Sequence, residues 1–137
     1  MNRFVIYGKL DDLNKFIKAN RTVRKLKNGK NFSLGSVMKK KNQEKINKYI
    51  VFALSKGDLE KVDRYPIGLT IKWYEPNNRR DIDNITFGTK FILDSMVCMG
   101  IIENDSRKYV DSIEHSVFTD KDNPRIEVEI NEPMCTD

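Results

Sequence analysis

A chain of 137 residues, of which 39% are hydrophobic and 33% charged, is long enough for one domain with a core that needs no disulfide or metal staples. No stretch approaches the ~18 apolar residues of a membrane span, and the apolar run at residues 4–7 is too short for a signal peptide. Cys98 and Cys135 fit no Cys-x-x-Cys pattern, so we expect reduced thiols in a cytoplasmic protein without a zinc cluster.

The charge is unevenly distributed along the chain. Residues 1–50 hold 14 Lys or Arg and 3 Asp or Glu, a net charge of +11, whereas the remainder holds 11 and 17, a net charge of −6, giving +5 for the whole chain. A basic half joined to an acidic half is typical of a protein that holds a polyanion beside an acidic site. The asymmetry favours nucleic acid as the partner.

In chain order, the first predicted element is a strand over residues 3–7 that ends at Gly8. Asp11 or Asp12 is placed to cap a short helix with Leu13, Phe16 and Ile17 on one face. Residues 21–41 are then predicted to form a basic, mobile loop that contacts phosphate. The residues of this segment that we assign to DNA binding are Arg21, Arg24, Lys25, Lys39 and Lys41.

A helix is predicted from a start within residues 36–43 to about residue 56, with Gly57 after its end. Its expected core residues are Ile46, Ile50, Ala53 and Leu54. Residues 67–74 alternate between apolar and polar side chains, which indicates a strand with one buried face. Trp73 is expected to be a core anchor of this strand.

The second half continues with a helix over residues 84–99, an acidic turn at residues 101–106, an extended segment at 108–118 and a strand at 126–130. His115, the one histidine, is expected to be structural or solvent-facing. Residues 1–137 are therefore predicted to form a single α/β (α+β) domain, with helices packed on a small mixed β-sheet.

The candidate site lies where the strand of residues 67–74 gives way to the next helix. Asp81 and Asp83 stand one residue apart beside Asn84, and carboxylates are the hard oxygen ligands that Mg²⁺ prefers. If the backbone is extended, the two carboxylates point to the same side, and Asp83 or Asn84 caps the helix. The alternative is ordinary turn-and-cap chemistry. An EF-hand loop is excluded, because Ile85 stands at its fifth position and Thr86 at its sixth.

Three segments carry a resemblance to a known family: residues 80–84 (Arg-Asp-Ile-Asp-Asn), residues 90–96, which open with Lys90, and residues 100–106, which contain Asp105. With the opening residues 7–10, they resemble the RusA family of Holliday junction resolvases, which are small metal-dependent endodeoxyribonucleases of phages and prophages. The resemblance implies a homodimer in the bacterial cytoplasm that uses Mg²⁺, with Mn²⁺ as a possible substitute, and needs no organic cofactor or membrane.

The same resemblance implies site residues. Asp81, Asp83 and Asp105 match the family's catalytic metal-binding aspartates, and Lys90 matches its catalytic lysine. Arg79 and Arg80 are added to the predicted DNA contacts. The chain departs from the family pattern in two places. Five residues separate Asn84 from Lys90, and the acidic turn reads Asn104-Asp105 rather than two acids, so that Glu103 is a candidate replacement. Whether Glu103 or Asp94 joins the site is left open by the sequence.

The distance along the helix raises a geometric question. A continuous helix over residues 84–99 spans about 24 Å, which the few residues before Asp105 cannot comfortably retrace. Either the helix begins later, near Gly88, or Asp105 joins the site of the other subunit.

Two other functions remain open at this stage. One is a branched-DNA-binding protein without catalysis, whose carboxylates are structural. The other is a Mg²⁺-dependent phosphohydrolase that acts on nucleotides, which leaves the basic half unexplained. The predicted substrate, if the resemblance holds, is a four-way DNA junction.

Overall fold

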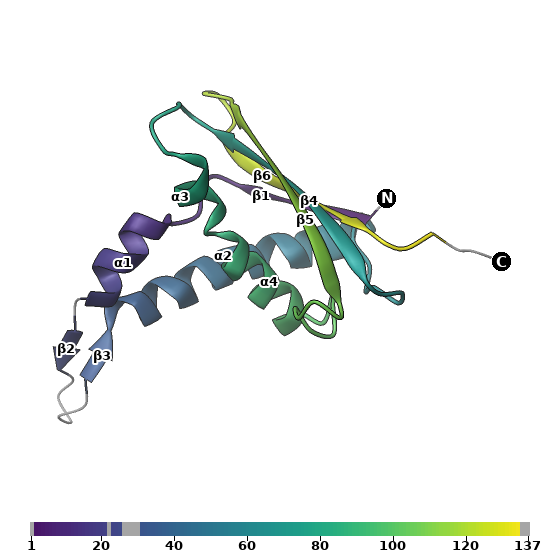
Figure 1. The fold of residues 1–137 in the computed structure, drawn as a ribbon, viewed down its shortest axis with the longest axis horizontal. Helices are drawn as coiled ribbons and strands as arrows, with labels where there is room; N and C mark the ends of the chain where they lie inside the picture. Colours follow the sequence, from purple (N-terminus) through teal and green to yellow (C-terminus); the bar gives the residue numbers. More distant parts are fainter. Residues whose placement is uncertain (1, 22, 26–30, 135–137) are drawn as a thin grey trace.

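A computed structural model describes residues 2–21, 23–25 and 31–134 (Figure 1). Within them the chain forms six strands and four helices. In chain order these are β1 (Asn2–Tyr7), α1 (Leu13–Arg21), β2 (Val23–Lys25), β3 (Asn31–Ser33), α2 (Leu34–Lys56), β4 (Ile67–Glu75), α3 (Ile82–Thr86), α4 (Thr89–Cys98), β5 (Val110–Thr119) and β6 (Arg125–Asn131). None of the helices among these described residues is long and apolar enough to cross a membrane.

The main sheet has four strands in the order β1-β6-β4-β5. β4 and β5 are parallel, whereas β6 is antiparallel to both of its neighbours, β1 and β4. The sheet is therefore mixed, and the predicted α+β fold is confirmed. Because β6 is antiparallel to both, β1 and β4 run in the same direction, and their C-terminal ends lie at the same end of the sheet.

The helices cover one face of this sheet, with α2 crossing beneath it (Figure 1). Residues of β4 alternate between buried and half-buried, so one face of the strand enters the core. Trp73 is 1% exposed, which confirms it as a core anchor. Ile46, Ile50 and Ala53 of α2 are buried as predicted.

The prediction that Leu54 is a core residue is wrong, because its side chain is 38% exposed. Leu54 follows Ala53 by one residue, and successive residues of an α-helix are rotated by about 100°. Ala53 completes the stripe that faces the sheet, and the next position is turned away from it. Glycine at position 57, with φ +80°, ends the helix as predicted.

The predicted loop at residues 21–41 is replaced by regular structure over much of its length. β2 and β3 pair antiparallel, and α2 begins at Leu34, so Lys39 and Lys41 lie on a helix. Ser33 explains the early start of α2, since its Oγ accepts a hydrogen bond from the backbone N–H of Gly35 at 2.9 Å. The predicted mobility stays a prediction, because residues 22 and 26–30 lie outside the described residues.

The single helix predicted over residues 84–99 is instead two helices, α3 and α4, separated by Phe87 and Gly88. The N–H of Gly88 donates to the carbonyl of Ile85, and that of Lys90 to Phe87, both at 3.2 Å and both with the tighter i to i+3 spacing. The option of a later helix start, near Gly88, is thereby confirmed.

Gly88 makes this junction possible by lying close to the core. A Cβ at this position would stand 3.1 Å from Cδ1 of Leu10 and 3.3 Å from Cη2 of Trp73. A side chain at this position would require Leu10 or Trp73 to shift by a few tenths of an ångström.

The two ends of the described chain lie together. Asn2 of β1 pairs with Ile130 of β6, so both ends emerge from the same end of the sheet. That end is remote from α1 and α3 (Figure 1).

Candidate active site

An ion-pair network at Arg80 supports the segment that carries the acidic motif. The guanidinium donates to both carboxylate oxygens of Glu75, from Nε at 2.7 Å and from Nη2 at 2.8 Å, and Nη1 donates to Oδ2 of Asp12 at 3.2 Å. Nη1 also reaches the carbonyl of Leu10 at 3.3 Å. Because Glu75 ends β4 and Asp12 follows β1, Arg80 joins the two loops at this end of the sheet.

The charges of this network are well matched. Burial acts to lower the pKa of Arg80, but Glu75 and Asp12 outweigh it and raise that pKa. Burial likewise acts to raise the pKa of Asp12, but the backbone N–H of Lys15 and the Arg80 guanidinium outweigh it, so the pKa of Asp12 is lowered. Asp12 also caps α1, as predicted, by accepting from Lys15 N–H at 2.9 Å.

Arg80 thus has a structural role that local sequence did not suggest. Its side chain is only 16% exposed and its hydrogen bonds are directed into the protein. The DNA contact assigned to it stays a prediction. By contrast, Arg79 is exposed, and among the described residues its side chain forms no hydrogen bond or ion pair.

Asp81 and Asp83 stand at the start of α3, at the end of the sheet where the Arg80 network lies. Both are exposed, and neither side chain forms a hydrogen bond or ion pair with any described residue. Asp81 occupies the N-cap position and Asp83 lies in the first turn, so the predicted extended backbone across the pair and the predicted cap at Asp83 or Asn84 are wrong. The Oδ1 of Asn84 instead accepts from the backbone N–H of Asn14 at 2.9 Å.

Lys90, in the first turn of α4, lies between two carboxylates. Its Nζ is 3.1 Å from Oδ1 of Asp94 and 3.6 Å from Oδ2 of Asp105. The hydrogen bond that Lys90 donates to Asp94 is the largest influence that raises the pKa of Lys90, and Asp105 adds to it. Lys90 is therefore held as a cation, and the Lys90 and Asp105 of one chain meet without a second subunit.

Asp94 connects this lysine to α2. Its Oδ2 is 3.4 Å from both Nζ of Lys39 and Nε2 of Gln43, and its side chain is 18% exposed. The pair that the i to i+4 spacing predicts between Lys90 and Asp94 is confirmed, but it is part of a network between two helices rather than an isolated surface pair.

The turn before β5 explains one departure from the family pattern. Oδ1 of Asn104 accepts hydrogen bonds from the backbone N–H groups of Asp105 at 2.7 Å and Ser106 at 3.2 Å. Asn104 therefore orders the turn that presents Asp105 to Lys90. The carboxylate of Glu103 is exposed and forms no ion pair with a described residue.

The predicted metal-binding aspartates are not gathered into one cluster. No group of three His, Cys, Asp or Glu side chains among the described residues is arranged to hold a metal ion. The topology accounts for this, because Asp81 and Asp83 follow the C-terminal end of β4, whereas Asp105 precedes the N-terminal end of the parallel strand β5. The two acidic segments thus belong to opposite ends of the α3–α4 crossover.

The sequence of this chain also matches a known protein family. The family model for the endodeoxyribonuclease RusA matches residues 17–131, a span that includes Asp81, Asp83, Lys90 and Asp105. The chain belongs to the RusA family. A search of curated proteins finds no match. Membership of RusA confirms the family resemblance and identifies the chain as a member of a family of endodeoxyribonucleases.

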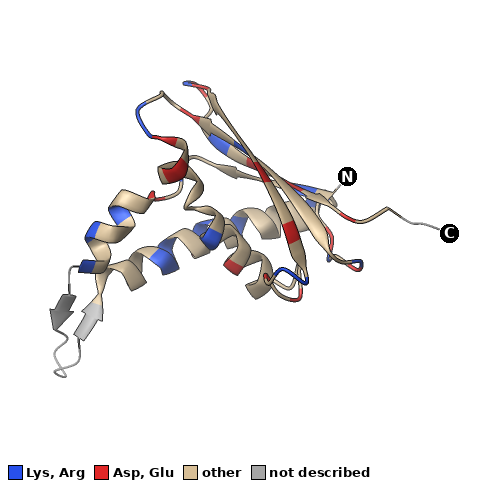
Figure 2. Ribbon diagram, in the orientation of Figure 1, with Lys and Arg blue, Asp and Glu red and all other residues tan. Residues whose placement is uncertain are grey.

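In this RusA-family chain, α1 and α2 carry many basic residues, whereas Asp83 lies on α3 and Asp94 on α4 (Figure 2). Arg21 and Lys41 are exposed, Lys39 is paired with Asp94, and nothing is described of the side chains of Arg24 and Lys25.

Several residues of the RusA-type site were missed from sequence. Gln43 reaches Asp94 across 51 positions of sequence, and Asp12 reaches Arg80 across 68. No local spacing marks such contacts. Lysines at positions 41, 45 and 48 do recur at helical spacing, and that signal could have indicated a basic face of α2.

Proposed function

We propose that this protein is a metal-dependent endodeoxyribonuclease that resolves four-way DNA junctions by paired phosphodiester hydrolysis, acting as a homodimer in the bacterial cytoplasm. Family membership supports the class of reaction. The observation that carries the proposal is the pair of exposed carboxylates of Asp81 and Asp83, which form no hydrogen bond or ion pair with any described residue.

The donor chemistry of these residues fits Mg²⁺, with Mn²⁺ as a substitute. Mg²⁺ is commonly bound by one or two carboxylates and keeps several of its waters, so a pair of solvent-facing aspartates is sufficient. Asp81 and Asp83 would hold the ion, and Asp105 is a further candidate from beside Lys90. When bound, the ion supplies an activated water and charge neutralisation on the phosphate.

Lys90 supplies positive charge to the phosphate. Its side chain is 59% exposed, so a phosphate oxygen can approach its ammonium. Asp94 acts on Lys90 by holding its Nζ, with Lys39 and Gln43 holding Asp94 in turn. Charge placed in advance where the transition state gains negative charge lowers the barrier to hydrolysis.

The DNA backbone would be held by basic residues around this centre. The residues proposed for these contacts are Arg79, Arg21, Arg24, Lys25, Lys39 and Lys41. We omit Arg80, because Glu75 and Asp12 occupy its guanidinium. Binding through phosphate contacts weakens steeply with added salt.

The proposed homodimer follows from the symmetry of the substrate. A four-way junction has approximate two-fold symmetry, and two nicks require two centres, which a C2 dimer of one chain provides. Because Lys90 and Asp105 meet within one chain, this part of each proposed centre needs no residue of the second subunit.

The test is a synthetic four-way junction incubated with the protein in the presence of Mg²⁺, and again with EDTA. We expect paired nicks that EDTA abolishes. Asp83→Asn should abolish cleavage and leave junction binding intact or tighter, because a repelling charge is removed while the phosphate contacts remain. Asp63→Asn, which alters an exposed aspartate in the connection after α2, is the matched control and should cut normally.

Each rival has its own outcome in this experiment. Junction binding without nicking under any metal supports the non-catalytic DNA-binding protein. Hydrolysis of nucleotides with no cleavage of the junction supports the phosphohydrolase. If Asp83→Asn instead loses junction binding, Asp83 is a structural residue.

A further inference from the structure

A second cluster of cations lies outside the acidic site. A pocket of about 170 Å³ opens between the loop after β1 and the helix α2. Three lysines, one aspartate and one asparagine line it: Lys9, Asp11, Lys41, Asn42 and Lys45. The lining thus carries more positive than negative charge.

The wall of this pocket is held firmly by Asn42, which is 4% exposed. Its Nδ2 donates to Oδ2 of Asp11 at 2.8 Å and to the carbonyl of Met38 at 2.7 Å, and its Oδ1 accepts from the backbone N–H of Asp11 at 3.0 Å. The loop after β1 is therefore fixed to α2, and the pocket is preformed.

Lys45 is the most constrained of the three lysines. Its Nζ donates to the carbonyl of Lys9 at 2.8 Å and packs over Gly8, where a Cβ would stand only 2.7 Å from it. Burial, followed by the nearby Lys48, lowers the pKa of Lys45, and Lys41 contributes in the same direction while Asp11 opposes it. An anion in the pocket would relieve this crowding of cations.

The pocket lies at the same end of the sheet as Asp81. β1 and β4 run in the same direction, so the loops that follow them are neighbours. Arg80 binds the carbonyl of Leu10 and the carboxylate of Asp12, which fixes the loop of the pocket to the segment that leads into Asp81.

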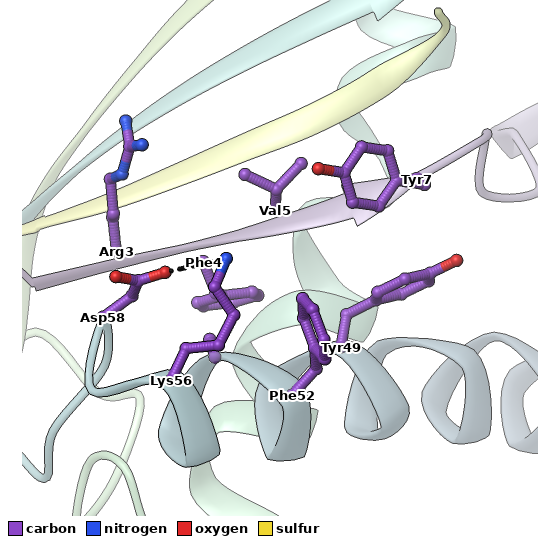
Figure 3. A pocket seen from close by; sticks show the side chains of 9 residues that line it. Arg3, Phe4, Val5, Tyr7, Tyr49, Phe52, Lys56 and Asp58 are labelled. Atoms are coloured by element: carbon purple, nitrogen blue, oxygen red, sulfur yellow. Dashed lines mark ion pairs between the residues drawn. The ribbon is translucent and has the colours of Figure 1, made fainter.

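The small cavity between β1 and α2 offers a contrast (Figure 3). Its volume is about 90 Å³, and aromatic rings such as Tyr49 and Phe52 form part of its wall. The ammonium of Lys56 is already paired there with Asp58 at 3.2 Å. That cavity has no comparable excess of positive charge.

We propose that the pocket between Lys9, Lys41 and Lys45 binds one phosphate group of the DNA backbone, beside the strand that is cut at Asp81 and Asp83. The assignment of DNA as the source of the phosphate rests on the proposed function. The pocket provides affinity and orientation and takes no part in hydrolysis.

The test measures the salt dependence of junction binding, by fluorescence anisotropy of a labelled four-way junction in EDTA. The double variant Lys41→Gln/Lys45→Gln is compared with the wild type and with Lys61→Gln, an exposed lysine in the connection after α2. Loss of one phosphate contact should make the slope of log K against log salt about 0.9 less negative. Lys61→Gln should keep the slope of the wild type.

Lys41→Gln alone guards against a folding artefact, because Lys41 is exposed and donates no hydrogen bond to a described residue. It should reduce the slope without a change in melting temperature. An unchanged slope in both variants, or an equal change in Lys61→Gln, overturns the proposal.

A titration with inorganic phosphate, followed by NMR shifts of the α2 amides, separates the two sources of phosphate. Saturable shifts at Lys41 and Lys45 with an unchanged DNA slope would mean a site for a free anion and overturn the assignment to DNA. If the wild type does not cut the junction but the slope changes as expected, the proposed nuclease function fails while the pocket stands.

Discussion

At the scale of single residues, the pair of Trp73 and His115 shows how the one histidine is used. The indole Nε1–H of Trp73 donates to Nδ1 of His115 at 3.0 Å, so this nitrogen must be unprotonated. Burial lowers the pKa of His115 in the folded protein. Of the two roles predicted for this histidine, structural or solvent-facing, the hydrogen bond with Trp73 supports the structural one.

This pair makes stability depend on pH. The unfolded chain, with an ordinary histidine pKa of about 6.5, takes up its proton at a higher pH than the folded chain does. The free energy of unfolding should therefore fall as the pH drops below about 6.5 towards the lower pKa of the folded state. Urea unfolding followed by the fluorescence of Trp73 measures this. His115→Gln, which retains an acceptor, should flatten the dependence, and a wild type with no pH dependence in this window would contradict the assignment.

Asp94 is expected to act as a positioning residue for Lys90. Asp94→Asn removes the charge that holds Nζ of both Lys90 and Lys39. A misplaced catalytic group commonly costs about 100-fold, so we expect kcat for junction cleavage to fall by 10- to 100-fold with little change in junction affinity.

The matched control for that variant is Asp58→Asn, which breaks the exposed ion pair between Asp58 and Lys56 at the C-terminal end of α2. It should leave kcat unchanged. A parallel loss of affinity and melting temperature in Asp94→Asn would show a general structural role instead.

At the scale of elements, the two consecutive arginines before α3 have different tasks. Arg80→Ala leaves two buried carboxylates, Glu75 and Asp12, without their partner, and such a loss typically costs about 3–5 kcal/mol. Arg79→Ala removes an exposed side chain and should change stability by no more than about 0.5 kcal/mol.

The effect on DNA binding should be the reverse of the effect on stability, with the larger loss in Arg79→Ala. Arg79→Ala should weaken binding for all sequences and reduce the salt slope by about 1. Chemical denaturation and anisotropy titrations measure the two effects. Equal losses of stability in the two variants would refute the structural role given to Arg80.

The helices and strands also show which parts of the fold can be predicted from the sequence alone. Alternation in residues 67–74 and helical spacing at Ile46, Ile50 and Ala53 report burial directly, and those elements were predicted correctly. The sequence predicted one helix over residues 84–99 and gave a start near Gly88 only as an option. The break at Gly88 depends on the approach of Leu10 and Trp73, which lie far from it in the chain.

The site was predictable to a similar extent. The spacing between Lys90 and Asp94 is local, and it gave a correct contact. The partners of Asp94 on α2 and of Arg80 on β4 and after β1 arise only from packing of the elements. Whether Asp81 and Asp83 bind a metal ion stays a prediction, since their carboxylates face solvent without partners among the described residues.

At the scale of the whole molecule, the charge is divided between the two halves of the chain. The basic first half supplies α1 and α2, and the second half supplies α3 and α4 with their carboxylates. The long-range repulsion between DNA and the acidic half should confine the duplex to the side of the basic helices.

The proposed homodimer gives a further expectation at this scale. Sedimentation equilibrium should give twice the chain mass of 16.0 kDa, and one dimer should bind each junction. A protein that stays at the mass of one chain while making paired nicks would contradict the symmetric arrangement.

The pairing of Asn2 with Ile130 has a practical consequence. The start of β1 and the end of β6 lie side by side, away from α1 and α3 (Figure 1). A biotin handle or fluorescent fusion attached at either end should leave α1 and the segment of Asp81 and Asp83 clear, so the enzyme can be tethered to glass and single cutting events observed. Joining the ends by a short peptide should likewise permit circular permutation without disturbing the segment that carries Asp81 and Asp83.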